Sequence, residues 1–169
     1  KGYRDFKSTH HMNQCIVGTF NKYIKEYDTL ICMGDWSFGG KDNIAKFREQ
    51  IVCKNILLTY GNHDHHIKKY PELRSLFTYC NDILSLSIDD HNFFMSHYSH
   101  QVWINQAKGT IHLFGHSHAN LEGLGKSMDV GIDVAYKMYG EYRPFHISEI
   151  IKLMEKREIH TIDHHTNDR

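Results

Sequence analysis

Two segments of the sequence decide the fold: TLICMGD at residues 29–35 and NILLTYGNHD at residues 55–64. Each begins with a run of apolar residues and ends in a glycine followed by polar side chains, which is typical of a buried strand that stops at the edge of a sheet. Between them, the apolar spacing over Asn43–Val52 predicts a helix. A strand, a helix and a strand in this order predict parallel strands joined by a right-handed crossover. Both polar endings are therefore expected at the same carboxyl edge of one sheet.

The rest of the chain shows further amphipathic helices and short strands. Asp89-Asp90-His91 is a polar cluster between two apolar runs and predicts the turn of an antiparallel hairpin. We therefore expect an α/β fold, a two-sheet mixed β-sandwich flanked by helices, within a single domain spanning residues 1–169. The other expected helices are Met12–Tyr27, a segment from about Pro71 to Phe77, and Ile147–Glu158, and the other expected strands are Asp82–Ile88, Asn92–Met95, Thr110–Phe114, Met128–Val134 and Glu158–Ile162.

The composition is that of an ordinary globular domain with no excess of either charge. The 169 residues are 40% hydrophobic, and 20 Lys and Arg balance 20 Asp and Glu. This balance provides no field that would hold the whole protein on nucleic acid or on an anionic membrane, although nucleic acid stays open as a substrate. The four widely spaced cysteines predict reduced thiols in a cytoplasmic protein rather than disulfides or a zinc site. No apolar run reaches the ~18 residues of a membrane span.

Polar residues follow the predicted strands at four places, and together they form a candidate metal site. The chain has 15 histidines, so a single histidine is uninformative and its position directly after a strand is the criterion. Oxygen and imidazole donors without a thiolate suit Mn, Fe, Zn or Ni. Two histidines separated by one residue could serve adjacent ions, which together would clamp a phosphoryl group. The candidate ligands are Asp35, Asn62, His97, His116 and His118.

These patches resemble the series D-x-H, G-D, G-N-H-[DE], H and G-H-x-H of the calcineurin-like metallophosphoesterase superfamily. The chain contains, in this order, Gly34-Asp35, Gly61-Asn62-His63-Asp64, His97 and Gly115-His116-Ser117-His118. Its segments LICMGDWSFGG, MSHY and VGIDV are similar to those of the small single-domain bacterial and phage phosphoesterases of this superfamily. The resemblance implies the αββα fold of these enzymes.

The resemblance also implies two divalent metal ions, with manganese favoured over Fe, Zn and Ni. Asp35 would bridge both ions. Asn62, His97 and His116 would complete one site, and His118 would serve the other. The implied activity is a metal-dependent phosphohydrolase that uses a metal-bridging hydroxide on a phosphodiester or nucleotide-type substrate.

For catalysis, the resemblance implies that His63 lies by the phosphate as general acid or charge stabiliser, with Asp64 orienting its ring. Two other classes of function stay open. The fold could serve as a binding scaffold without catalysis, or a binuclear site could hydrolyse an amide or lactone. The presence of both His63 and Asp64 argues against the scaffold, which would not need them.

The first motif of the series, D-x-H, is absent ahead of Gly34-Asp35. The simplest expectation is that the sequence starts late and lacks an N-terminal strand that carries this motif. A second possibility is that Asp163 and His165 near the C-terminus supply the D-x-H. In the remaining case, one metal site is complete and the other lacks the ligands that the D-x-H motif would supply.

Several further residues have more than one reading. Asp129 and Asp133 flank the VGI segment of the predicted strand Met128–Val134, and we expect ordinary exposed carboxylates rather than site residues. Three aromatic residues could either stack on a nucleobase or pack in the core, and both readings stay open: Trp36, Tyr98 and Trp103.

Overall fold

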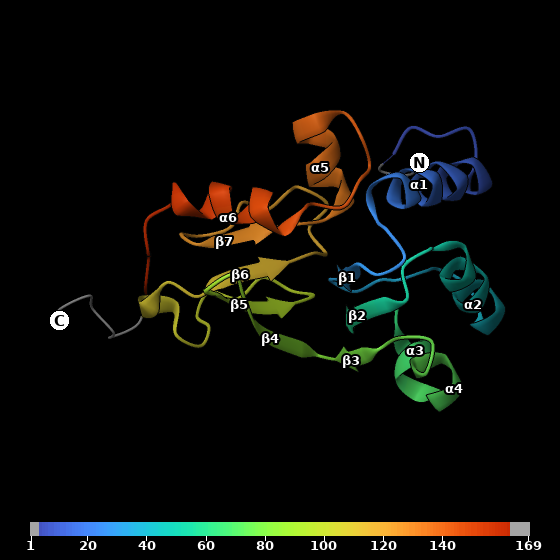
Figure 1. The fold of residues 1–169 in the computed structure, drawn as a ribbon, viewed down its shortest axis with the longest axis horizontal. Coiled ribbons are helices and arrows are strands. Elements are labelled where there is room, and N and C mark those ends of the chain that lie inside the picture. The colour runs from blue at the N-terminus through green and yellow to red at the C-terminus, as the bar shows by residue number, and fades with distance from the viewer. Residues whose placement is uncertain (1–3, 163–169) are drawn as a thin grey trace.

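The computed structural model describes residues 4–162, which form two β-sheets with helices on their outer sides (Figure 1). The first sheet is parallel and consists of β1 (Thr29–Cys32), β2 (Asn55–Thr59) and β3 (Tyr79–Asn81). The second sheet consists, in spatial order, of β4 (Ile83–Ile88), β5 (His91–Ser96), β6 (Ile111–Phe114) and β7 (Ser127–Asp129). The α-helices are α1 (Thr9–Tyr23), α2 (Lys41–Gln50), α3 (His65–Lys69), α4 (Pro71–Arg74), α5 (Ile132–Tyr139) and α6 (Ile147–Glu155).

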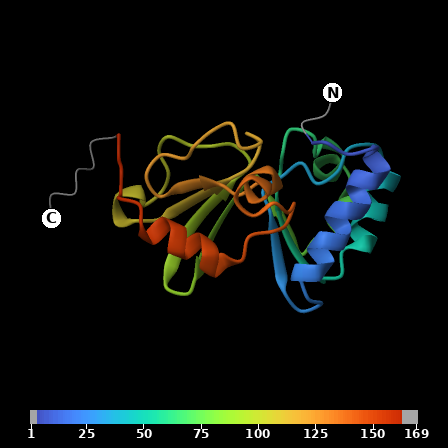
Figure 2. The same ribbon diagram turned by 90° about the horizontal axis from the view of Figure 1, so that it is seen from above.

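The unit β1–α2–β2 has the parallel arrangement predicted from the sequence. Successive residues of a strand point to opposite faces, so each strand divides its side chains between two cores. Leu30 and Ile56 pack in the core that includes Val17 of α1. Ile31 and Leu57 pack against the core of the second sheet. The first sheet therefore lies between the second sheet and the helices α1 and α2, while α6 lies beside the second sheet (Figure 2).

The hairpin of β4 and β5 is also confirmed. Its strands pair from Ile83 with Ser96 to Ile88 with His91. Asp89 and Asp90 form the turn with φ values of 47° and 62°, the left-handed conformations that a two-residue hairpin requires. Because β5 runs parallel to β6, the residues that follow these two strands leave the sheet at the same edge.

Some element boundaries differ from the prediction because of local caps. Helix α1 starts at Thr9, where the Ser8 side chain accepts a hydrogen bond from the His11 N–H at 3.1 Å. Proline lacks an N–H and is suited to the first position of a helix, so Pro71 starts a separate helix, α4, directly after α3. Helix α6 ends at Glu155, earlier than predicted.

Two predicted strands are wrong. The segment Met128–Val134 is not one strand, because Asp129 Oδ1 accepts the Gly131 N–H at 2.7 Å; this turns the chain after β7, and α5 starts at Ile132. The segment Glu158–Ile162 pairs with no strand within residues 4–162. Its His160 carbonyl instead accepts a hydrogen bond from the Gln106 side chain at 2.9 Å.

Candidate metal centre

The predicted ligands leave the two sheets at adjacent strand ends. Asp35 follows β1 and Asn62 follows β2 of the first sheet. His97 and His116 follow β5 and β6 of the second sheet. The structure brings these four side chains together between the sheets. Asp163 and His165, the alternative D-x-H, lie outside the described residues.

The Nε2 atom of His97 lies at the middle of this group. It is 3.0 Å from Asn62 Oδ1, 3.1 Å from His116 Nδ1 and 3.6 Å from Asp35 Oδ2. The other ring nitrogen, Nδ1, lies 2.7 Å from the Met33 carbonyl, which can only accept, so Nδ1 carries the proton and Nε2 carries a lone pair. His97 is buried, with 2% of its surface exposed. Within residues 4–162, Asp35, His97 and His116 form the one group of His, Cys, Asp and Glu side chains spaced to hold a metal ion.

These spacings fit a divalent ion. Metal–ligand bonds of about 2.1 Å place neighbouring donors about 3.0 Å apart in an octahedron and about 3.4 Å apart in a tetrahedron. His97 Nε2, Asn62 Oδ1 and Asp35 Oδ2 all present lone pairs, which repel one another unless a cation or a proton lies between them. The donor set of oxygen and imidazole matches the one expected from the sequence.

Several of the candidate ligands have a strained backbone. Asp35, His116 and His118 have φ values of 56°, 64° and 48°, in the left-handed region that residues other than glycine rarely adopt. Such a conformation costs on the order of 1–3 kcal/mol and persists only where the surrounding structure enforces it. Strained residues cluster at functional sites. Their occurrence at three candidate ligands supports a functional role for this region.

Two glycines allow the turns to approach one another this closely. A Cβ on Gly34 would lie 2.5 Å from His97 Nδ1 and 2.7 Å from the Gly61 backbone N. A Cβ on Gly61 would lie 2.5 Å from the Asp35 backbone N. Real Cβ atoms do not come this close to other atoms, so a side chain at either position would push the two turns apart. The absence of a side chain at these two glycines therefore makes room for the candidate ligands.

Asp64 ties the two turns of the first sheet to each other. Its carboxylate is 1% exposed and accepts hydrogen bonds from the backbone N–H groups of Asp35 at 2.7 Å, Trp36 at 2.9 Å and Gly61 at 2.8 Å. Burial raises the pKa of Asp64, and these hydrogen bonds offset part of the increase. No hydrogen bond between Asp64 and the His63 ring is found in residues 4–162, so the orienting role of Asp64 stays a prediction.

His63 lies exposed at the edge of the centre. Its backbone N–H donates to Asp35 Oδ1 at 2.9 Å, which fixes its main chain relative to the candidate bridging carboxylate. Its ring packs against Phe38, with ring centroids 4.5 Å apart. The imidazole is therefore accessible to a ligand that reaches the centre.

His118 is not part of the group around His97. Its Nδ1 lies 2.7 Å from Asp133 Oδ2, and Asp133 in turn accepts two hydrogen bonds from Arg4, at 2.7 Å from Nε and 2.8 Å from Nη2. Burial acts to raise the pKa of Asp133, but the hydrogen bonds from Arg4 and His118 outweigh it and hold the pKa below its ordinary value. The structure thus assembles four candidate ligands in one group and holds the fifth, His118, apart from it.

The expectation that Asp129 and Asp133 are ordinary exposed carboxylates on a strand is wrong. Asp133 lies in the first turn of α5 and its side chain is 14% exposed. Asp129 is 3% exposed and accepts hydrogen bonds from the Ser117 hydroxyl and from the Ala119 N–H, so it holds the turn that carries His116 and His118. The sequence contains only a weak signal for Asp129, a carboxylate close to a glycine at Asp129-Val130-Gly131, and none for Asp133, whose partner Arg4 lies 129 residues away.

The aromatic residues left open by the sequence divide into two kinds. Trp36 is buried against Phe47 and Phe77, and Trp103 is buried with its Nε1–H donating to the Thr110 carbonyl at 2.8 Å. Both therefore pack in the core. Tyr98 is 49% exposed and its ring contacts the rings of His97 and His116, with centroids 4.8 and 4.7 Å away. The ring of Tyr98 therefore remains available for stacking on a ligand beside the centre.

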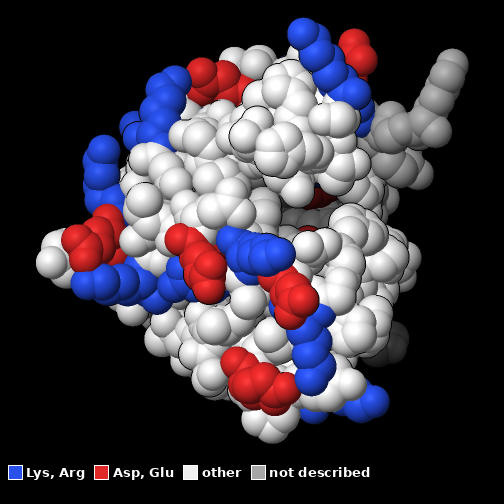
Figure 3. All heavy atoms as spheres, turned by 90° about the vertical axis from the view of Figure 1, so that its right-hand side faces the viewer, with Lys and Arg blue, Asp and Glu red and all other residues white. Residues whose placement is uncertain are grey.

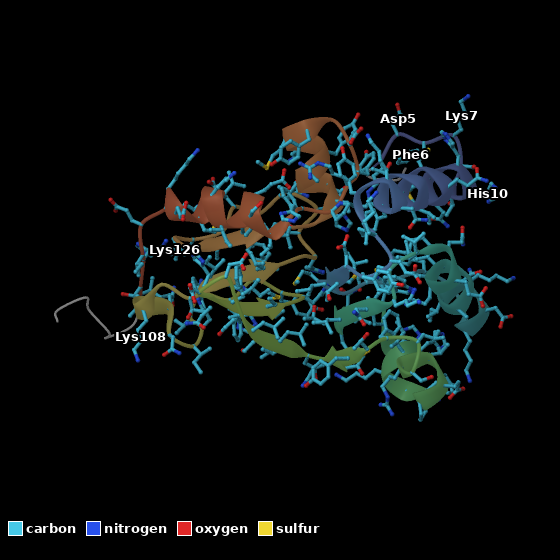
Figure 4. All side chains as sticks on the ribbon, viewed as in Figure 1. Asp5, Phe6, Lys7, His10, Lys108 and Lys126 are labelled. Carbon is cyan, nitrogen blue, oxygen red and sulfur yellow. The ribbon has the colours of Figure 1, made fainter. Side chains whose placement is uncertain are left out.

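A cavity of about 620 Å³ adjoins His118 and Asp133. It lies between the N-terminal segment, α1 and α5, and Figure 4 labels Asp5 and Phe6 of that segment near α1. On the side of the molecule that lies to the right in Figure 1, Lys and Arg side chains are interspersed with Asp and Glu, without a large patch of one charge (Figure 3). No helix in residues 4–162 is both long and apolar enough to cross a membrane.

A comparison with protein families matches residues 7–128 to the calcineurin-like phosphoesterase superfamily domain. The chain belongs to this superfamily. Membership indicates a hydrolase of phosphate esters that uses divalent metal ions. A search of curated proteins finds no match to this phosphoesterase chain.

Two solved structures resemble this calcineurin-like chain. A protein of unknown function from Aquifex aeolicus is 22% identical, with a TM-score of 0.65 over 88% of this chain and 87% of that one, and it shows the fold alone. An archaeal phosphodiesterase is 27% identical, with a TM-score of 0.51 over 73% of this chain and 79% of that one. The predicted two-sheet metallophosphoesterase fold is confirmed.

Proposed function

We propose that this protein is a metal-dependent phosphodiesterase that uses two divalent ions, manganese being the favoured one. The observation that carries this proposal is the convergence of Asp35, Asn62 and His116 on the Nε2 atom of His97, at 3.0 to 3.6 Å. Donors at this spacing fit one divalent ion, and membership in the superfamily supplies the chemistry of phosphate esters.

Each ligand has an assigned place in the proposal. Asn62, His97 and His116 hold one ion, Asp35 is shared by both ions, and His118 belongs to the second ion. When bound, divalent ions neutralise the charge of a phosphoryl group and lower the pKa of water. The left-handed turns of Asp35 and His116 persist only because the surrounding structure enforces them, which supports donor atoms that are held in place before a ligand arrives.

His63 is proposed as the group that protonates the leaving oxygen. Its main chain is fixed by the hydrogen bond to Asp35, while its exposed ring can reach a phosphate ester at the centre. Imidazole is the side chain that most often serves as a general acid or base in enzymes. The anchoring of both turns by Asp64 supports this placement.

The preference for a diester or nucleotide-type substrate rests on two observations. The archaeal protein that resembles the chain is a phosphodiesterase. Two exposed aromatic residues lie beside the centre. Phe38 packs against the ring of His63, and Tyr98 contacts the rings of His97 and His116. Aromatic rings offer a stacking surface for a planar leaving group such as a nucleobase.

The test is hydrolysis of bis-p-nitrophenyl phosphate and of p-nitrophenyl phosphate by the full-length protein with added Mn²⁺. We expect faster turnover of the diester, and loss of turnover of both in Asp35→Asn. A protein that binds Mn²⁺ but hydrolyses neither substrate with any of Mn²⁺, Zn²⁺, Ni²⁺ or Fe²⁺ would contradict the proposal. That result would favour the binding scaffold.

A further inference from the structure

Three elements far apart in the sequence meet at His118. The histidine follows β6, Asp133 lies in the first turn of α5, and Arg4 lies in the segment ahead of α1. Asp133 Oδ2 accepts a hydrogen bond from His118 Nδ1 at 2.7 Å. Both carboxylate oxygens of Asp133 also accept hydrogen bonds from Arg4. Only 14% of the Asp133 side chain and 19% of the Arg4 side chain are exposed.

The contact with Asp133 determines which nitrogen of His118 can bind a cation. An ionised carboxylate can only accept a hydrogen bond, so Nδ1 carries the proton and the lone pair of the neutral ring lies on Nε2. Without such a partner, the neutral ring of histidine prefers the opposite tautomer, with the proton on Nε2. The carboxylate therefore selects the form of His118 that presents Nε2 as a donor atom.

The centre already contains one histidine that is set in this way. His97 Nδ1 donates to the Met33 carbonyl, and this leaves its Nε2 facing Asn62 and Asp35. Partners of this kind fix the tautomer and the ring orientation of metal-binding histidines and raise their basicity. At His118 a charged carboxylate replaces the neutral carbonyl, so the effect on basicity is expected to be larger.

Arg4 makes the position of the carboxylate specific. A guanidinium that binds both oxygens of a carboxylate fixes its plane as well as its distance. Because the pair is mostly withdrawn from solvent, it is screened less than an ion pair on the surface. Arg4 therefore holds Asp133 in the orientation that receives His118 Nδ1–H.

We propose that Asp133, held by Arg4, is a positioning residue that fixes His118 with its proton on Nδ1 and its metal-binding lone pair on Nε2. This inference rests on the proposed role of His118 as ligand of the second ion. The competing interpretation is a purely structural ion pair that fastens the N-terminal segment to α5 without influence on the histidine.

The first test reads the His118 tautomer directly by ¹⁵N–¹H NMR of the chain in EDTA at a pH of about 8, where ordinary histidines are neutral. We expect the Nδ1–H form in the wild type and a shift toward the Nε2–H form in Asp133→Ala and in Asp133→Leu, which keeps the volume. Glu141→Ala is the matched control, since Glu141 lines the same cavity and pairs with Lys22. An unchanged His97 spectrum shows that the fold is intact. The same His118 tautomer in all four proteins would overturn the proposal.

The second test is a Mn²⁺ titration of the full-length protein, followed by competition with a chelator. We expect the ion that His118 holds to bind 10- to 100-fold more weakly in Asp133→Ala, while the affinity for the other ion stays unchanged. In Glu141→Ala, the affinities for both ions should equal those of the wild type. If the wild type binds its ions and Asp133→Ala binds them with the same affinities, the inference is overturned. Failure of the proposed function would look different, as a wild type that binds no divalent ion.

Discussion

The two halves of the candidate centre are held in different ways. Asp35, Asn62, His97 and His116, the backbone-held half, are placed by strand ends, close glycine contacts and hydrogen bonds to main-chain groups. His118, the ion-pair-held half, depends on the side chains of Asp133 and Arg4, which are 129 residues apart in the sequence.

This difference separates what motifs specify from what tertiary structure specifies. In the backbone-held half, the residues that create the geometry are neighbours of the ligands in the sequence: Gly34 beside Asp35, and Gly61 with Asp64 beside Asn62. These supporting residues therefore lie in the same short motifs as the candidate ligands, although the contacts themselves join different motifs, as between Met33 and His97. In the other half, the positioning groups come from distant elements and exist only after α5 and the N-terminal segment have packed together.

The replacement Asp35→Asn should break the backbone-held half with the largest effect. The amide oxygen can still accept the His63 N–H, so the fold should survive, but the negative charge that both ions would share is lost. We expect release of at least one ion and a decrease of turnover by orders of magnitude. Metal content and rate near those of the wild type would show that Asp35 does not bridge.

His63→Ala tests the chemistry while it leaves the ligands of both halves in place. We expect metal occupancy to persist and turnover to fall by about 10²- to 10⁴-fold, with the larger loss for substrates with poor leaving groups. The comparison requires an alkyl and an aryl diester measured side by side. Equal losses for the two esters would move His63 from proton donor to ground-state positioning.

Asp64→Ala sharpens the distinction, because it removes a support of the backbone-held half without removing a ligand. Three backbone N–H groups lose their acceptor in a buried region, and the protein should be destabilised by about 3 kcal/mol in urea unfolding. Glu72→Ala is the control, since Glu72 makes an exposed ion pair with Lys41 and should leave the midpoint nearly unchanged. Equal midpoints for both variants would contradict the anchoring role of Asp64.

His112 provides a histidine of β6 that faces the core rather than the centre. It is fully buried, accepts the His100 N–H at Nε2, and burial lowers its pKa from the ordinary 6.5 to about 4. Between these values the unfolded chain binds a proton that the folded chain does not. Its contribution to stability is therefore present above pH 6.5 and is lost as the pH falls toward 4.

The expected loss from this one group is about 2 kcal/mol between pH 7 and pH 5. Urea unfolding of the wild type and of His112→Gln at both pH values measures it, with the exposed His10→Gln as control. The pH dependence should weaken in His112→Gln and persist in His10→Gln. The same pH dependence in all three proteins would show that His112 is not a buried neutral ring.

Much of the fold could be predicted because its signals are local. The parallel unit of β1, α2 and β2 and the turn at Asp89-Asp90 follow from apolar periodicity and turn chemistry, and both are confirmed. The strand predicted over Met128–Val134 was wrong because the Asp129 side chain bends the chain at Gly131, and apolar periodicity cannot detect this. The short strand β3 was not predicted, since its pairing with β2 decides it.

The candidate site could be predicted to the same extent and for the same reason. The positions directly after strands gave four candidate ligands whose side chains the structure brings together. Asp129 and Asp133 were misjudged as exposed carboxylates, because their burial depends on contacts with the turn after β6 and with Arg4. Patterns within one sequence do not reveal an ion pair between residues that are 129 positions apart.

The number of divalent ions that the chain of residues 1–169 binds tightly tests the central claim most directly. Loading with Mn²⁺, gel filtration and elemental analysis should give one ion per chain. That ion should be lost in His97→Ala and retained in His118→Ala, because within residues 4–162 the backbone-held half offers four candidate ligands and the other half offers only His118 besides the shared Asp35. Two tightly bound ions would contradict this account and make Asp163 and His165 the substitute ligands, and an ion retained in His97→Ala would contradict it as well.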